Sequence, residues 1–322
     1  MPVLNALVTQ AKNTIAAYKT IILKWQKFCL IEGFPDCPAQ AKHLCEFISQ
    51  LALNKAPLST FSKLSPALVF FHDANRVKKA SAMEDPFVKL VLEGAKREAA
   101  ERKPTTKKAP TLSQSEVHHL IDQTIWRNGP GKIGPNPDLI VWRTVVCLFV
   151  CYKTFCRFSC YQQLTSKDIE IFENHISVEF KHAKNDQFYN GTFSLLAALD
   201  GSPYCPKLIV SSYFQVMGFS RMQTEYLNCR ILNSKNNSRA KPGERLCYSN
   251  SNKDNKNVLH SVGLTKKYSE KSFKVAGVSH AIDKNVPLLD IQSHGRWKSL
   301  EVPLIYTKKS EKRRLEVSKV VV

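Results

Sequence analysis

Residues 294–310, HGRWKSLEVPLIYTKKS, contain the pattern from which this chain is best understood. Trp297 lies between two cations, Arg296 and Lys298, and Tyr306 follows nine residues later, just before a basic run. A tyrosine in an apolar helix is usually a packed aromatic residue, whereas one set among cations can be a reacting group. The sequence upstream has to decide between these two interpretations.

The composition points to a polyanionic partner. The chain has 322 residues, enough for about two domains, and 43% of them are hydrophobic, which supports a sizeable core. Its 47 Lys and Arg against 27 Asp and Glu give a formal charge of +20, which attracts nucleic acid. A membrane surface is the second candidate, but no stretch approaches the roughly 18 apolar residues of a spanning helix.

The N-terminal residues MPVLNALVTQAK have neither a cationic start nor a long apolar stretch, so we expect a protein that is not secreted. In the cytosol or nucleus its ten cysteines should be reduced. Cys147, Cys151, Cys156 and Cys160 are close together, but in a helix-like apolar segment and not on turns, as zinc ligands usually are. We expect them to be small buried residues and predict no metal site.

The first hundred residues predict four helices and no strand. Apolar residues recur at steps of three and four in residues 11–30, at Ile15, Tyr18, Ile22, Trp25 and Phe28 or Cys29. Further helices are expected near residues 40–53, from a cap at Ser59 or Thr60, and from Pro86 after Asp85. We therefore predict a helical domain over 1–102 and a polar, proline-broken linker over 103–112.

Residues 113–322 predict a second domain that mixes helices with a few strands. Ser113, followed by Glu116, is a helix-start signature. Residues 175–197 alternate like a hairpin, with Asn-Asp and Asn-Gly as turn candidates. Residues 228–256 are polar and predict a long mobile loop. The fold class expected is mainly α with a small β-sheet (α+β).

Four pieces of the second domain occur in a recognisable order: TFCRFSCYQQLTSKDI at 154–169, HAKNDQFYNG at 182–191 followed by GSPYCP, residues 270–299, and IYTKKSEKRR at 305–314. Together they resemble the tyrosine recombinase (phage integrase) family, most closely its eukaryotic members associated with mobile elements. The resemblance covers nearly the whole chain, because residues 1–102 are similar to that family's helical core-binding (SAM-like) domain.

This resemblance implies a C-shaped clamp on double-stranded DNA, with the core-binding domain on one side and a catalytic domain on the other. It implies metal-free and cofactor-free strand transfer for DNA integration or recombination. A tyrosine oxygen attacks a backbone phosphodiester, giving a 3′-phosphotyrosine and a free 5′-hydroxyl. It further implies four protomers on DNA, no small-molecule substrate and, for a eukaryotic member, a nuclear location.

The resemblance also assigns roles to single residues. Tyr306 matches the nucleophile, and Trp297 the position that donates an indole N–H to the phosphate. Arg157 matches the first catalytic arginine, although Phe155 stands where a glycine is common and Cys160 where an acid is usual. Lys184 matches the lysine that protonates the leaving oxygen, with Lys181 as the fallback. Arg296, Lys298 and Lys181 are the expected DNA contacts.

The chain departs from the family at its second box, His-x-x-Arg. The expected positions hold Lys271 and Lys274, and none of the nine histidines begins such a box. On a helix both lysines can face one phosphate, whereas His280 is about 180° away from Lys271. Lysine keeps the charge but lacks the planar fork of arginine, and with a free pKa of about 10.4 it donates protons poorly at neutral pH.

Three functions therefore stay open. The chain is a working but weakened recombinase in which Lys271 and Lys274 act as electrostatic substitutes, or a catalytically inactive DNA-binding descendant of a mobile-element recombinase. A third alternative is a basic helical scaffold or RNA-binding protein, against which the four ordered motifs argue.

Overall fold

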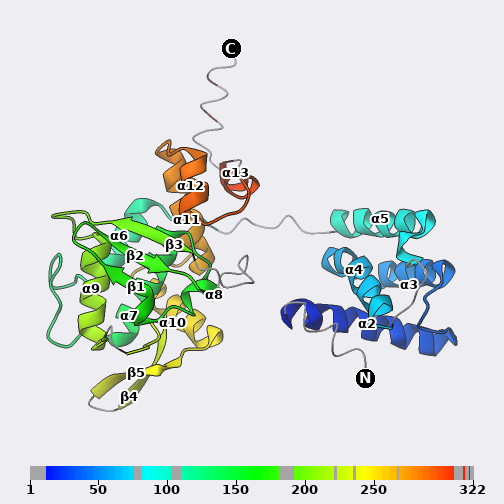
Figure 1. Cartoon of the computed structure of the whole chain (residues 1–322), viewed down its shortest axis with the longest axis horizontal. Coiled ribbons are helices and arrows are strands. Elements are labelled where there is room, and N and C mark those ends of the chain that lie inside the picture. The colour runs from blue at the N-terminus through cyan, green and yellow to red at the C-terminus, as the bar shows by residue number, and fades with distance from the viewer. Residues whose placement is uncertain are drawn as a thin grey trace. The chain divides into compact units, whose positions relative to one another are not determined.

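The computed structural model describes residues 12–75, 82–102, 110–181, 192–220, 223–234, 237–266 and 268–307, together with residues 315 and 319. The chain divides into two compact units, Met1–Lys107 and Lys108–Val322, and this division falls within the stretch predicted as a linker (Figure 1). The described residues are mainly helical with two small antiparallel sheets, which confirms the predicted α+β class. No helix within these ranges is long and apolar enough to span a bilayer.

Unit 1 is helical throughout its described residues. It consists of α2 (Lys12–Glu32), α3 (Ala41–Leu53), α4 (Leu58–Ala74), a 3-10 turn η2 (Ala82–Glu84) and α5 (Pro86–Glu101). Each helix contributes one apolar stripe to a single core centred on Trp25, Leu44, Phe61 and Leu64, all fully buried. The four predicted helices are therefore confirmed.

Two details of unit 1 differ from prediction. Ile21 is the buried isoleucine of α2, whereas Ile22, which was assigned to the stripe, is only half-buried. Helix α4 starts at Leu58 directly after Pro57, so the predicted cap at Ser59 or Thr60 is wrong. The predicted start of α5 is confirmed: the Asp85 carboxylate accepts the backbone N–H groups of Phe87 and Val88.

Unit 2 contains the remaining elements. They are α6 (Gln114–Asp122), α7 (Leu139–Thr154), α8 (Phe158–Tyr161), η3 (Ser166–Asp168), β1 (Ile169–Ile171), β2 (His175–Glu179), β3 (Phe193–Ala197), α9 (Pro206–Met217), β4 (Cys229–Ser234), β5 (Asn237–Arg245), α10 (Tyr248–Ser261), α11 (Glu270–Asp283), α12 (Leu288–His294) and α13 (Glu301–Thr307). The Ser113 and Glu116 capping box opens α6 as predicted.

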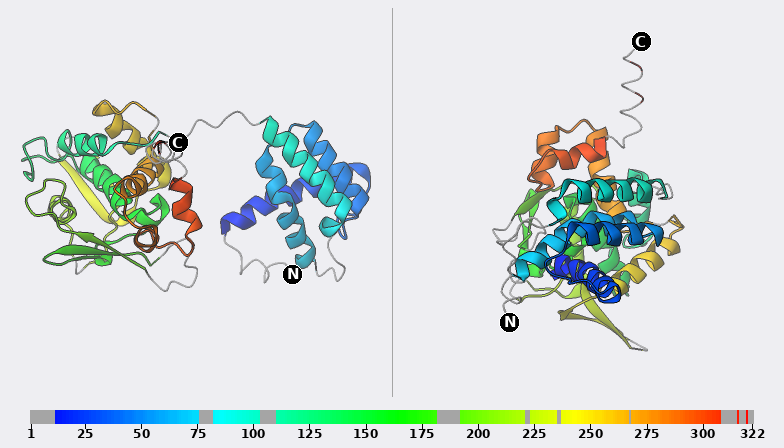
Figure 2. Two further views of the ribbon diagram at one scale, coloured as in Figure 1. Left: turned by 90° about the horizontal axis from the view of Figure 1, so that it is seen from above. Right: turned by 90° about the vertical axis from the view of Figure 1, so that its right-hand side faces the viewer.

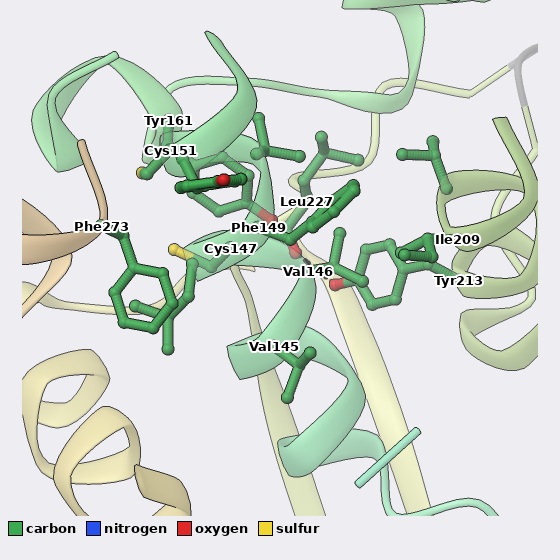
Figure 3. Close-up of a cluster of buried hydrophobic side chains, with 14 of the residues drawn as sticks. Val145, Val146, Cys147, Phe149, Cys151, Tyr161, Ile209, Tyr213, Leu227 and Phe273 are labelled. Carbon is green, nitrogen blue, oxygen red and sulfur yellow. Dashed lines mark hydrogen bonds between the residues drawn. The ribbon is translucent and has the colours of Figure 1, made fainter. Parts of the chain in front are cut away.

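Helix α7 is the axis of unit 2, because nearly all of its residues are buried. Figure 3 shows several of its side chains among those of other elements, such as Tyr161, Tyr213 and Phe273. Helices α9, α10 and α11 and strand β3 pack around it. Cys147 and Cys151 lie in its interior face with Cys156 and Cys160 just beyond, so all four cysteines are buried packing residues, as predicted. A helix with apolar residues on all of its faces has no side that favours solvent, so neighbouring elements must surround it.

The three-stranded sheet has the order β1-β2-β3 with antiparallel pairing. Val178 pairs with Ser194 and Ile176 with Leu196, which confirms the predicted hairpin of residues 175–197. Its inward residues Ile176, Val178 and Leu196 join the core beside α7. The predicted Asn-Asp and Asn-Gly turns lie outside the described residues.

The prediction of a mobile loop over residues 228–256 is wrong. This segment forms the antiparallel β4–β5 hairpin and most of α10. Polar side chains hid the strands: among the strand residues whose burial the structure describes, Cys229 is buried, and Ile231 and Ala240 pack against the edge of the core. The buried Arg143 guanidinium donates to the Cys229 carbonyl over 2.8 Å and pairs with Asp254 of α10, which fastens both elements to α7.

Candidate functional site

The site is built where α7 ends. Phe155 closes this helix in the left-handed conformation (φ 53°), which is unfavourable for a residue other than glycine. The final carbonyl groups of α7 are capped from a distant segment: His294 Nε2 lies 2.7 Å from the Lys153 oxygen, and Arg296 Nη2 donates to the Thr154 oxygen over 3.0 Å. The chain then turns immediately to Arg157.

Trp297 is held in a stack of aromatic rings. It is 6% exposed, and its ring lies nearly parallel to those of Phe155 and Tyr306, with centroids 6.3 and 6.0 Å away. A Cβ on Gly295 would come within 2.8 Å of the indole, so this turn needs glycine. The left-handed backbone of Phe155 places the ring of this residue in the stack with Trp297, the residue predicted to bind phosphate.

Tyr306 lies on α13, half-buried against Trp297 and the small cluster of Phe155, Val278, Ile282 and Ile291. Burial raises the pKa of its phenol, and the positive charge of Arg157 acts in the opposite direction. Arg157 is exposed and precedes α8, and its effect on the pKa of Tyr306 shows that the predicted nucleophile and the predicted first arginine lie in the same neighbourhood.

Lys274 completes the group. It is only 6% exposed on α11, and its ammonium lies 5.3 Å from the centre of the Trp297 ring. Burial lowers the pKa of Lys274 to about 8, with the charge of Arg157 as the second cause. Cys156 and Cys160 favour its charged form, whereas Arg296 opposes it. The expectation of an ordinary lysine pKa is therefore wrong for Lys274.

Helix α11 separates the other candidates of the degenerate box. Lys271 is exposed one turn before Lys274. His280 Nδ1 lies 2.8 Å from the Tyr152 hydroxyl on α7, so this histidine is engaged elsewhere, as its helical position predicts. Gly277 allows the close approach of α11 to α7, because a Cβ there would lie 2.0 Å from the Tyr152 carbonyl oxygen.

Arg296 differs from its predicted role as a DNA contact. Besides Thr154, its guanidinium donates to the His294 carbonyl over 3.1 Å and to the Ser194 hydroxyl, and it lies 4.1 Å from the Phe180 ring centre. These bonds use its planar fork inside unit 2 and join the end of α7 to the β2–β3 hairpin. The neighbouring Lys298 is exposed, and its role as a DNA contact stays a prediction.

The remaining predicted lysines lie at the hairpin. Lys181 is half-exposed, with its ammonium 2.6 Å from Asp168 Oδ1 and 3.2 Å from Glu179 Oε2, and the hydrogen bond to Asp168 chiefly raises its pKa. It is thus held by two carboxylates just beyond the end of β2, on the turn side of the hairpin. Lys184 lies outside the described residues, so its predicted role stays a prediction.

Two residues that shape the site were missed in the sequence. His294 and Phe155 carry no chemical role of their own, yet one caps α7 and the other supports Trp297. His294 was visible only as a histidine next to the glycine turn, since a cap across 141 residues leaves no local signal. Among the described residues, no group of three or more His, Cys, Asp or Glu side chains could hold a metal ion.

The fold is similar to those of solved recombinase and integrase structures. The structure of XerH site-specific recombinase bound to palindromic difH substrate superposes with a TM-score of 0.64 at 16% identity, covering 95% of this chain and 79% of that one. The Tn1549 transposon integrase in complex with transposon right end DNA gives a TM-score of 0.57 at 10% identity, with both chains fully covered. No family model matches the sequence, and no curated protein sequence matches it either.

The chain therefore has the tyrosine recombinase fold. This likeness spans both units, and at such low identity it is a statement about the fold alone. The positions of Arg157, Lys274, Trp297 and Tyr306 come from the structure itself.

The depressed pKa of Lys274 predicts a gain in stability when its charge is removed. A group with a folded pKa near 8 and an unfolded pKa near 10.4 disfavours folding below pH 8, and this cost disappears as the pH rises toward 10.4. We expect Lys274→Met to stabilise unit 2 at pH 7 by on the order of 1 to 3 kcal/mol. Urea unfolding at pH 7 and pH 10 should show this gain at pH 7 and little of it at pH 10.

The internal bonds of Arg296 predict that it and Lys298 respond differently to substitution. Arg296→Lys keeps the charge but cannot reach both carbonyl groups, so we expect it to lower the free energy of unfolding by roughly 2 kcal/mol. Lys298→Gln, the exposed control, should stay within about 0.5 kcal/mol of wild type. Equal stabilities of the two variants in urea would contradict the interior role of Arg296.

Proposed function

We propose that the chain binds double-stranded DNA and cleaves one strand through a 3′-phosphotyrosine link to Tyr306, as a weakened member of the tyrosine recombinases. The observation that supports this most is the convergence of Arg157, Lys274, Trp297 and Tyr306, contributed by four separate segments, at the end of α7. The solved XerH and Tn1549 integrase structures are complexes with DNA, in line with this proposal.

Each residue has a distinct part in the proposed reaction. The cations of Arg157 and Lys274 hold the non-bridging oxygens of the phosphodiester, where negative charge gathers in the transition state. The phenol oxygen of Tyr306 attacks phosphorus while its proton passes to water, the bond to the 5′-oxygen breaks, and Lys184 supplies the proton for the leaving hydroxyl. Trp297 donates its indole N–H to the phosphate and keeps Tyr306 oriented by stacking.

The box substitution limits the expected rate. A lysine at 274 provides one compact charge where the family's arginine forms two parallel bonds, and the histidine that assists proton transfer is absent. Losing one preorganised donor in such a site typically costs about 10²-fold to 10³-fold in rate. DNA affinity should be kept, because both positions remain cationic.

The alternative is a catalytically inactive DNA-binding descendant of a mobile-element recombinase. It is favoured by the exposed position of Lys271, which carries an ammonium where the family has an imidazole. The proposed relationship to eukaryotic mobile-element recombinases, the clamp of both units around DNA and the assembly of four protomers apply equally to both alternatives.

A covalent-trapping assay distinguishes the two functions. Duplexes bound by the chain are first selected from a random-sequence pool, then supplied with a nick beside each candidate phosphate so that the cleaved fragment diffuses away. We expect a protein–DNA adduct that resists denaturation in wild type and disappears in Tyr306→Phe. Tyr248→Phe, which changes an exposed tyrosine of the same unit, is the matched control and should keep the adduct. Binding without an adduct would favour the inactive descendant.

Rebuilding the family's box should raise cleavage. In Lys271→His with Lys274→Arg, the fork of arginine and a titratable imidazole return to the phosphate, so we expect adduct formation to accelerate by about 10²-fold. The single variant Lys271→His separates the contribution of the histidine from that of the arginine. An unchanged rate in an active enzyme would mean that residues 271 and 274 are not the positions of the box.

A further inference from the structure

The β4–β5 hairpin is unusually basic and takes no part in the site described above. Residues 229–245 contain five basic residues and one acidic residue. In Figure 1 the hairpin projects from unit 2 at the end opposite to α12 and α13, and the right-hand view of Figure 2 shows the same separation. It therefore lies well away from Trp297 and Tyr306.

The base of the hairpin is rigidly attached. The backbone N–H of Tyr226 donates to the Pro242 carbonyl over 2.9 Å, and the N–H of Leu246 donates to Asn228 over 2.8 Å. Together with the bond from Arg143 to Cys229, these contacts hold the two strands against the core. A surface built on such a support is fixed in position before any partner binds.

The strand register sorts the side chains onto two faces. Ile231 pairs with Ala240, and both pack against the core. Since side chains alternate along a strand, the neighbouring pairs Arg230–Lys241 and Leu232–Arg239 lie on the opposite face. Arg230, Arg239 and Lys241 are all exposed and define the basic stripe of the hairpin.

Glu244 orders part of this stripe. Its carboxylate pairs with Arg230 over 3.4 Å and with Lys241, so one acidic group holds two cations near each other. These hydrogen bonds and charges lower the pKa of Glu244, which keeps it ionised at neutral pH. The stripe still has an excess of positive charge, because three cations face one carboxylate.

We propose that the basic stripe binds the phosphate backbone of duplex DNA at a distance from the cleaved bond. This proposal rests on the proposed function and extends the DNA contact of unit 2 beyond the tyrosine site. Arg239 and Lys241 are two residues apart on β5, roughly 7 Å, so they can contact separate phosphates. Cations displayed on a rigid strand face suit a repeating anionic backbone and carry no sequence preference.

The test is the salt dependence of duplex binding by the full chain. Log affinity falls linearly with log salt concentration, and each phosphate contact makes this slope steeper by about 0.9. We expect Arg239→Gln with Lys241→Gln to reduce the magnitude of this slope by about 1 to 2 and the affinity by on the order of tenfold. Lys132→Gln with Lys207→Gln, an equal charge change on other parts of unit 2, is the control and should leave the slope unchanged. Glu244→Gln should strengthen binding, because it removes a competing carboxylate.

The outcomes separate the two proposals. If wild type binds duplex DNA but the hairpin and control variants give the same slope, the basic stripe is not a DNA contact, while the proposed function stands. If wild type does not bind duplex DNA, the proposed function and the stripe fall together. If the two double variants give the same urea unfolding curve, a smaller salt dependence of the hairpin variant cannot be attributed to loss of the fold.

Discussion

The end of helix α7 is the point on which the rest of unit 2 depends. An α-helix leaves its last carbonyl groups without partners, and a buried helix cannot leave them to water. Here they are satisfied by His294 and Arg296, from a segment about 140 residues further along the chain. The positive charge of Arg296 at this end also interacts favourably with the negative end of the helix dipole. The end of α7 and the turn at Trp297 therefore depend on each other for their hydrogen bonds.

The same junction explains why four distant segments meet. Arg296 contacts the Ser194 hydroxyl on β3 and the ring of Phe180 beyond β2, so the hairpin, the segment leading to Arg157 and the turn before α13 share one side chain. The proposed phosphoryl transfer needs its reacting groups held to within a fraction of an ångström, and this shared side chain gives the segments a common support.

Local patterns in the sequence were sufficient for much of this architecture. Helices α2, α3 and α5 followed from apolar periodicity and capping, and the β2–β3 hairpin from alternation bounded by turn residues. The β4–β5 hairpin could not be recognised, because residues 229–245 contain few apolar residues and show no regular alternation of apolar and polar residues. The interior role of Arg296 and the lowered pKa of Lys274 depend on burial by residues far away in the chain, which no local pattern encodes.

The buried charge of Lys274 links the stability of unit 2 to the presence of a bound anion. Without an anion, this ammonium is held in a poorly solvated place close to another cation, Arg157, and the fold carries that repulsion. An oxyanion placed between the two would relieve it, so the occupied state is intrinsically more stable than the empty one. Under the proposed function, a bound polyanion stabilises the fold of this chain, and a preparation stripped of nucleic acid is its less stable form.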